Sequence, residues 1–577
     1  MQSPSTALQC LALLTTFAVG VAAQDPGKRE PSGRDDPPQD TRAVGEPTPA
    51  PDHFLPISSR WFSPGHPIDG VAPPEYEEVN RAGDGLNPYT QNVLKGDFPI
   101  FGTEDLFLNT TVTNRAILQF RNVPTPVGIT GTGPVNTNFF GDGKQFFFND
   151  DLAVSFDLFK GQQAFKPVDW RLKVTPVFNV NYLEVQEVGV VDIDVSEGTT
   201  RTRTDFALQE AFAEIHLFDL SDRYDFLSIE AGILPFRSDF RGFMFDDVNL
   251  GVRVFGNYDN NLWQYNAAYF NTLDKNTNSL LNEFESRDQQ VVILNLYRQD
   301  WPVRGYTTSF SFHHNNDDRE FEFDDNGFLV APAPAGQAQP NRVESYYLGW
   351  AGEGHLGRFN ITHQFYQALG RESNNPFAAQ GVDINAQFAA IELSYDIDWW
   401  RPRIFSLYAS GDDDPRDGEG GGFDAIFDAP RFAGGDASFF TSQNIRLLGV
   451  GLTNQQSPLV DLQTSKFQGQ ANSVNPGVWI TGAAVDVEVT PETRLEVGGN
   501  YLRFMDTGSL ETFLQIPNVD KEIGYEVFAL TQYRPTLTNN WIIQVGANAF
   551  FPGDGFANLY ESDETLYSVF TTVLTTF

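Results

Sequence analysis

The sequence predicts an all-β protein, a transmembrane antiparallel β-barrel of about 18 strands with long extracellular loops and short periplasmic turns. Three observations predict this fold. The chain begins with an export signal, apolar and polar residues alternate from Leu106 onward, and the connections between the alternating stretches are short and long in turn. The composition agrees with a barrel, because a polar lumen face offsets the lipid-facing side and keeps the mean hydropathy at -0.31.

Residues 1–23 are predicted to be a cleaved signal peptide. The apolar run from Ala7 to Val21 is followed by small residues before Gln24, as signal peptidase requires, although no Lys or Arg precedes the run. The one cysteine of the chain, Cys10, lies inside this segment. Cleavage therefore leaves a protein without disulfides, thiol nucleophiles or thiolate metal sites.

Residues 24–99 are predicted to be a disordered, Pro-rich periplasmic leader. The segment is rich in Pro, Gly and charged residues, as in Glu46 to Pro51, and it shows no helical or strand period. A partner-binding or peptidoglycan-proximal role is the alternative. No long apolar run follows Gln24, so the sequence predicts no transmembrane helix.

Residues 100–577 are predicted to form the barrel. In Leu108 to Arg121 and in Trp170 to Tyr182, one face is apolar and the other carries Asn, Thr, Gln, Arg or Lys. Alternation over about ten residues is typical of a barrel strand. The predicted strands begin near residues 106, 146, 168, 203, 224, 249, 261, 288, 305, 342, 358, 385, 401, 478, 493, 521, 540 and 566.

The connections between these strands alternate in length. Tight turns such as 221–223 and 491–492 are separated by longer segments rich in Asp, Gly and Asn. This alternation places turns on one rim and loops on the other, as in outer-membrane barrels. It requires residues 446–453 to belong to the seventh loop, which we expect to fold inward and narrow the lumen. The predicted long loops are 122–145, 187–202, 235–249, 272–287, 316–341, 370–385, 411–477, 506–520 and 553–565.

The last predicted strand runs from Leu566 to the terminal Phe577. Its outward residues are Tyr567, Val569, Val573 and Phe577. The last strand of a barrel must pair with the first. A terminal aromatic residue after alternating apolar residues resembles the signal that is read by the outer-membrane barrel assembly machinery, which makes this machinery an expected partner.

The charge excludes one class of function. The chain has 76 acidic and 38 basic residues, a formal net charge of -38. A polyanion cannot release counterions from nucleic acid, so we expect no nucleic-acid partner. Much of the acidic excess lies in the long loops, as in 411–427, and a further share lies on the predicted lumen face.

Basic residues on the polar faces of the strands are the candidate solute-binding residues of the lumen. They either form a ladder that attracts anions or satisfy neighbouring carboxylates. These residues are Arg115, Arg121, Arg171, Lys173, Arg253 and Arg358. The predicted lumen acids are Asp151, Asp157, Glu230, Glu392, Asp396, Asp486, Glu488, Glu496, Glu522 and Glu526. The lumen charge is thus mixed with a net negative lean, and basic early strands opposite acidic later strands would create a transverse field.

Three further patterns are interpreted as structural. Aromatic residues such as Trp263, Tyr269 and Trp399 are expected to form interface girdles rather than a surface for sugar stacking. The acidic run from Asp412 to Glu419 matches no calcium-loop template and is expected to be solvated, with Mg²⁺ bridging it to lipopolysaccharide as a further role. The two rings of the pair His313 and His314 should point to opposite faces of a strand, which disfavours a metal site.

Two stretches resemble motifs of the bacterial alginate-export family of outer-membrane barrels. They are Leu407 to Phe427, which reads LYASGDDDPRDGEGGGFDAIF, and Phe550 to Phe556, which reads FFPGDGF. The resemblance implies an 18-stranded barrel that passes a polysaccharide or a smaller solute by diffusion, with loops that gate the pore. The mixed lumen charge differs from the lining expected of a polyuronate exporter, whose constriction should carry Arg and Lys.

The sequence therefore predicts an outer-membrane porin or exporter of the alginate-export type, with no enzymatic chemistry, cofactor or metal. Polysaccharide, sugar or small hydrophilic solutes would pass through a water-filled lumen, and the surrounding lipid would include lipopolysaccharide. One alternative is a barrel sheath for a periplasmic or surface partner such as an electron-transfer protein. The other is a surface hydrolase, although no GxSxG, HExxH or Walker sequence occurs.

Overall fold

The computed structural model describes residues 93–127, 140–161, 167–223, 225–335, 338–443, 447, 453 and 455–577. The predicted signal peptide and most of the predicted leader lie outside these residues. The same holds for most of residues 446–453.

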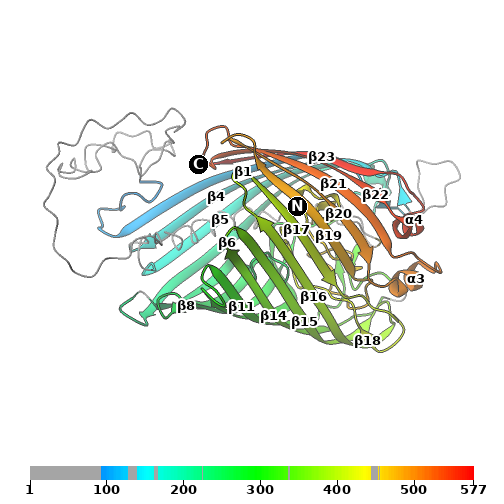
Figure 1. Ribbon diagram of the computed structural model, residues 1–577, viewed down its shortest axis with the longest axis horizontal. Coiled ribbons are helices and arrows are strands. Elements are labelled where there is room, and N and C mark those ends of the chain that lie inside the picture. The colour runs from blue at the N-terminus through cyan, green and yellow to red at the C-terminus, as the bar shows by residue number, and fades with distance from the viewer. Residues whose placement is uncertain are drawn as a thin grey trace. The chain divides into compact units, whose positions relative to one another are not determined.

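Eighteen antiparallel strands form one closed barrel (Figure 1). Every predicted strand is present. The barrel strands are β1 (Leu106–Asn122), β4 (Lys144–Lys160), β5 (Trp170–Glu184), β6 (Thr200–Asp219), β7 (Phe226–Arg237), β8 (Asp246–Tyr258), β9 (Trp263–Lys275), β10 (Asn282–Arg298), β11 (Tyr306–Asp317), β14 (Val343–Leu356), β15 (Phe359–Asn375), β16 (Gln380–Tyr395), β17 (Trp400–Ala409), β19 (Val478–Glu488), β20 (Thr493–Phe504), β21 (Glu522–Tyr533), β22 (Trp541–Pro552) and β23 (Leu566–Thr576).

The last strand closes the barrel against the first, as predicted. β1 pairs with β4 on one side and with β23 on the other, so that Ala116 lies opposite both Asp150 and Val573. The backbone N–H of Phe577 donates to the carbonyl of Val112 over 2.8 Å, which extends the pairing to the final residue. Closure leaves the described barrel sheet without an unpaired edge strand.

The two rims differ as the sequence predicts. One rim, the turn rim, carries the tight connections, such as 357–358 and 489–492, whereas the loop rim carries segments such as 318–342 and 410–477. β17 pairs directly with β19, so no further strand lies between these two in the wall. Three predicted long loops are shorter than expected, because the strand ladders continue beyond the apolar stretches. These connections are 238–245, 276–281 and 376–379.

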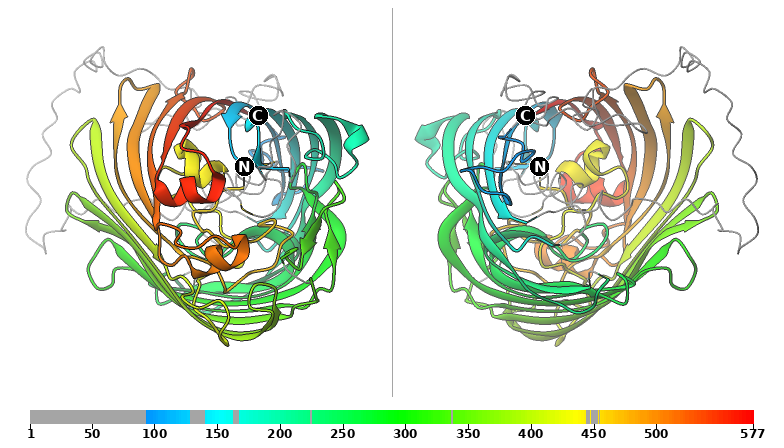
Figure 2. Two further views of the ribbon diagram at one scale, coloured as in Figure 1. Left: turned by 90° about the vertical axis from the view of Figure 1, so that its right-hand side faces the viewer. Right: turned by 90° about the vertical axis from the view of Figure 1, so that its left-hand side faces the viewer.

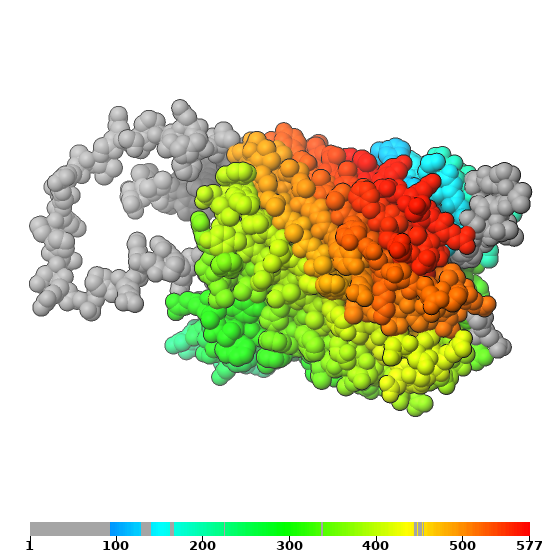
Figure 3. Space-filling model, turned by 45° about the vertical axis from the view of Figure 1, so that its right-hand side comes forward, coloured from blue at the N-terminus to red at the C-terminus, as the bar shows by residue number. Residues whose placement is uncertain are grey.

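The outer face of the barrel carries an apolar belt. Along β1 and β5, Leu118, Phe120, Leu172 and Phe178 point outward and are exposed, whereas their sequence neighbours face the lumen. In Figure 3 the outer surface formed by the later part of the chain, coloured green to red, is continuous. Exposed apolar side chains on these strands include Ile404, Val497, Val527 and Val569. Large apolar side chains in a closed ring of this kind require lipid rather than water around them. The fold is therefore that of a transmembrane β-barrel.

Short elements occupy the loops. They are the paired strands β2 (Thr125–Pro126) and β3 (Phe140–Gly141), the paired strands β12 (Glu322–Phe323) and β13 (Leu329–Ala331), β18 (Glu419–Gly420), the 3-10 turns Val195–Glu197 and Gly435–Ala437, and the helices α2 (Phe439–Gln443), α3 (Gly508–Leu514) and α4 (Asp554–Tyr560). None of the helices in the described ranges is long and apolar enough to cross a membrane.

Candidate functional site

Two stretches of the lumen wall, separated by β7–β15 on one side and adjoining at the β1–β23 pair on the other, differ in character. On β1 and β4–β6, which we call the polar half, the lumen-facing side chains are mostly Arg, Asn, Gln, Asp, Glu and Thr. On β16–β23, the apolar half, many are aliphatic or aromatic. Buried examples on the polar half are Gln119, Asn149, Asp151, Thr175, Asn179 and Asn181. Buried examples on the apolar half are Phe388, Leu407, Val478, Ile480, Leu502, Phe528 and Phe550.

Two loops enter the lumen and join there. The backbone N–H of Phe427 donates to the carbonyl of Met244 over 3.0 Å, and that of Ala429 donates to Gly242 over 2.8 Å. Residues 239–245, between β7 and β8, and residues 427–431, between β17 and β19, thus form a short backbone ladder that we call the loop bridge. Figure 2 shows the yellow segment that includes α2 inside the ring of strands. The predicted inward folding of the seventh loop is confirmed.

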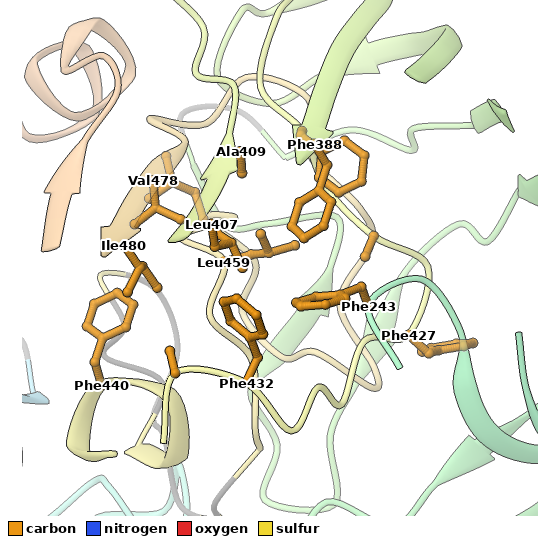
Figure 4. Close-up of a cluster of buried hydrophobic side chains, with 14 of the residues drawn as sticks. Phe243, Phe388, Leu407, Ala409, Phe427, Phe432, Phe440, Leu459, Val478 and Ile480 are labelled. Atoms are coloured by element: carbon orange, nitrogen blue, oxygen red, sulfur yellow. The ribbon is translucent and has the colours of Figure 1, made fainter. Parts of the chain in front are cut away.

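Aromatic packing fixes the loop bridge to the apolar half. The ring of Phe243 lies 4.9 Å from that of Phe388 on β16 and 5.2 Å from that of Phe432. Phe432 in turn lies 5.6 Å from Phe405 on β17. Figure 4 shows Phe243, Phe388 and Phe432 in this cluster. Burial of several aromatic rings removes a large apolar area from water, so this contact strongly favours the inward position of the loops.

One carboxylate orders the first of the two loops. Asp239 accepts hydrogen bonds from the backbone N–H groups of Arg241, Phe243 and Met244 at 2.9 to 3.1 Å. The hydroxyl of Tyr366 on β15 also donates to Asp239, over 2.9 Å. A single acidic side chain thus closes the tip of the loop and attaches it to the barrel wall.

The seventh loop crosses the lumen and is held at several points of the wall. Asn500 on β20 donates to the carbonyl of Ala433 over 2.8 Å. Asn548 on β22 donates to the carbonyl of Ala437 over 2.9 Å. On the polar half, Arg121 of β1 donates to the side-chain oxygen of Gln443 over 3.1 Å. These contacts hold the seventh loop across the lumen, and the loop therefore narrows the lumen near the loop bridge.

Three of the predicted basic residues face the lumen in ion pairs. Arg171 contacts Asp157 at 3.2 Å and Glu214 at 3.1 Å. Lys173 contacts Glu210 at 2.9 Å. Arg253 contacts Glu230, also at 2.9 Å. For these three residues the geometry favours the pairing interpretation over a ladder of free cations.

The other two predicted residues of the polar half are buried beside the loop. Arg115 lies within electrostatic reach of Asp151 and of Asp436 from the seventh loop. Arg121 also donates to Gln145 over 2.9 Å, and its guanidinium lies 5.4 Å from the ring centre of Phe147. Both arginines therefore connect the wall to the loop that narrows it.

The prediction that Arg358 faces the lumen is wrong. Arg358 lies in the turn between β14 and β15, and its exposed side chain contacts Asp398 in the next turn at 3.6 Å. The preceding Gly357 has a φ of 65°, which turns the chain before the alternation can place Arg358 on a face. The predicted lumen residue Asp396 also lies in a turn, between β16 and β17, where it pairs with Arg401.

Sequence reasoning missed the main cations of the later strands. Arg403 on β17 contacts Glu392 at 3.5 Å, Asp486 at 3.1 Å and also Glu496. Arg241, on the loop bridge, contacts Glu392 at 3.0 Å. These guanidinium groups lie among the predicted acids, so the described residues do not form separate basic and acidic walls.

The residues considered as metal ligands, His313, His314 and Asp412, are not grouped into a metal site among the described residues. His313 faces the lumen and is fully buried, whereas His314 faces outward beside Glu344, so the two rings point to opposite faces as predicted. Asp412 is buried and accepts a hydrogen bond from the backbone N–H of Gly421 over 3.0 Å. Within the described ranges, no group of three or more His, Cys, Asp or Glu side chains is placed to hold a metal ion.

No family model matches the chain, and no curated protein sequence matches it. Among solved structures, OccK2 (OpdF) of Pseudomonas aeruginosa is 10% identical with a TM-score of 0.45, and the match covers 82% of this chain and 97% of that one. OccAB4 of Acinetobacter baumannii is 10% identical with a TM-score of 0.44, over 82% and 98%. OpdK of P. aeruginosa, solved with vanillate, is 8% identical with a TM-score of 0.44, over 81% and 98%. The resemblance to the alginate-export family stays a prediction.

Proposed function

We propose that this protein is an outer-membrane channel for the passive passage of small hydrophilic solutes. One observation carries the proposal. The lumen of a closed transmembrane barrel is narrowed by loops that pack on its apolar half, while the polar half, β1 and β4–β6, borders the lumen beside it. A wall of amides, hydroxyls and paired charges can replace the hydration shell of a polar solute in transit.

The passage is expected to open along the polar half. If the seventh loop moved off the apolar half, the rings of Phe243 and Phe432 would become exposed to water. On the polar half, its contact with Arg121 is a hydrogen bond that water can replace at little net cost. Opening on that side is therefore the less costly movement, and β1 and β4–β6 would line the passage.

The sequence predicts passage of a polysaccharide, a sugar or another small hydrophilic solute, and the proposal is limited to the small solutes. Loops that bridge the lumen leave less room for a polysaccharide chain than for a monosaccharide-sized solute. They also disfavour the alternative of a barrel that encloses a protein partner, because the partner would occupy the space that the loops fill. Passage of uronate oligomers, which the alginate-export resemblance implies, is the finer hypothesis. The proposal also includes export through signal 1–23, barrel insertion by the assembly machinery and contact with lipopolysaccharide at the loop rim.

Liposome swelling tests the proposed passage. Vesicles that contain the refolded protein should admit glucose faster than a trisaccharide, and both faster than uronate oligomers. Faster entry of uronate oligomers than of glucose would instead support the alginate-export type. No swelling with any solute, from a barrel shown to be folded by its shifted mobility in unheated gels, would contradict a passive channel.

Cross-linking tests the location of the passage, because the predicted mature chain has no cysteine. Cysteines at Arg121 and Gln443, joined by a short bifunctional thiol reagent, should close the polar side and lower the conductance in planar bilayers. The matched pair at Asn500 and Ala433 joins the same loop to the apolar half and should leave the conductance nearly unchanged. Equal loss from both pairs would contradict a passage along the polar half.

A further inference from the structure

Arg201 on β6 is buried in the lumen wall without a partner. Its side chain lies on the lumen face of the polar half, opposite Leu183 of β5, and the residue is 4% exposed. All three nitrogens of its guanidinium lack a hydrogen-bond partner. Among the buried arginines that the structure describes, it is the one whose three guanidinium nitrogens all lack a hydrogen-bond partner.

This arrangement contrasts with the other lumen cations. Arg171, Arg253 and Arg403 each contact at least one carboxylate within 3.2 Å. Around Arg201, the carboxylates of Asp205 and Asp324 lie within electrostatic reach, but no described carboxylate lies within ion-pair distance. A buried charge without hydrogen bonds is costly, so five N–H donors in a fixed fork are available here for an acceptor.

The neighbours of Arg201 supply an acceptor and an apolar floor. Asn181 lies one cross-strand pair away on the same face, opposite Arg203, and its side-chain oxygen also lacks a partner. Its amide nitrogen is used, because it donates to Asn179 over 2.7 Å. Leu183, opposite Arg201, and Phe147, the next residue across on β4, are fully buried and apolar.

We propose that Arg201 and Asn181 form a binding subsite for a small solute that carries an oxyanion beside hydroxyl groups. The Arg201 fork would donate to the carboxylate or phosphate oxygens, and the Asn181 oxygen would accept from a hydroxyl. Leu183 and Phe147 would contact the carbon skeleton. The negative charges of Asp205 and Asp324 partly offset the positive charge of Arg201 and would lower the affinity of the subsite for an anion. A solute in transit must bind weakly enough to leave again. The subsite rests on the proposed channel function.

The variant Arg201→Gln tests the subsite through the ratio of two swelling rates. Glucuronate and glucose 6-phosphate serve as carboxylate and phosphate probes, and glucose is the neutral reference. The ratio of each anion rate to the glucose rate should fall by about tenfold in the variant, while glucose entry stays the same. The larger of the two reductions identifies the oxyanion. Arg201→Lys keeps the charge but loses the fork, and it should give an intermediate ratio.

Arg203→Gln is the matched control, because it removes the same charge from the same lumen face, two residues along β6, where the side chain is exposed. It should change the ratios much less than Arg201→Gln. Equal effects of the two variants would show a general field and overturn the subsite, as would an unchanged ratio in Arg201→Gln. If the wild-type barrel admits no solute, the channel function itself fails, which is a distinct outcome.

Discussion

Arg403 neutralises three lumen carboxylates with a single side chain. Its guanidinium is shared by Glu392, Asp486 and Glu496, and its side chain is mostly buried. Replacement by Gln would leave these acids close together in the wall without a cation. We expect Arg403→Gln to lower the free energy of unfolding by about 3 kcal/mol and to increase cation selectivity.

Urea unfolding in lipid vesicles and reversal potentials in planar bilayers measure these two effects. Arg401→Gln is the control, because Arg401 pairs with Asp396 at the turn rim and is about half exposed. Unchanged stability and selectivity in Arg403→Gln would show that the three carboxylates do not depend on Arg403.

Asp412, at the base of the seventh loop, should make that loop sensitive to pH. Burial, with a contribution from the neighbouring Asp413, Asp414 and Asp417, raises the pKa of Asp412 to about 7. A raised carboxyl pKa means that the folded loop holds a proton that the unfolded chain releases near pH 4. Its contribution to stability is therefore fully present below about pH 4 and is lost as the pH rises through 7.

Hydrogen exchange of residues 410–421 measures this pH effect. Protection should fall between pH 6 and 8 in the wild type, beyond the intrinsic change in exchange rate. In Asp412→Asn it should not fall, because the amide stays neutral. The same fall in both proteins would assign the effect to another group.

At the residue level, alternation predicts which face a side chain occupies only inside a strand. It placed Arg115, Arg121, Arg171, Lys173 and Arg253 correctly, because each lies within a regular ladder. It failed for Arg358 because a turn begins one residue earlier. The same rule could have identified Arg403, because it alternates with the outward-facing Ile404 and Tyr408 and must therefore face the lumen.

At the level of elements, the loop bridge depends on one acceptor. Asp239 accepts hydrogen bonds from backbone N–H groups that would otherwise lack partners. We expect Asp239→Asn to loosen residues 239–245, because an amide accepts fewer and weaker hydrogen bonds than a carboxylate, at a cost of about 2 kcal/mol. Single-channel recordings should show a larger or noisier conductance. Tyr366→Phe removes one of these bonds and should have a smaller effect of the same kind, whereas a quiet, unaltered Asp239→Asn channel would contradict the role of this acceptor.

The strands were predictable and the loop bridge was not. Alternation of side chains reports the local environment of each strand, so all barrel strands could be located from the sequence. The contact between 239–245 and 427–431 joins segments far apart in the chain and has no local period. A partial signal existed, because the phenylalanines of residues 423–440 are unusual in a loop that faces water.

At the level of the whole molecule, the barrel has a hydrophobic core on the inside as well as an apolar belt on the outside. A continuous cluster of buried apolar residues includes Phe423, Phe432, Leu459 and Phe467 of the seventh loop together with wall residues of β16–β23. Replacement of residues 423–475 by a short Gly/Ser linker should therefore raise the conductance and also lower the thermal stability of the barrel. Gel mobility after heating measures the second effect. A deletion barrel with wild-type stability would show that the inner cluster contributes little to the fold.

The closure of the barrel also covers part of the terminal aromatic ring. Lys95, which precedes the first strand, places its ammonium 4.0 Å from the ring centre of the terminal Phe577. If the assembly machinery binds that terminal ring, as the sequence predicts, then pairing of β23 with β1 places the ring beside Lys95 and makes it less accessible to the machinery. On this expectation, closure of the barrel and weakening of its assembly signal are one event.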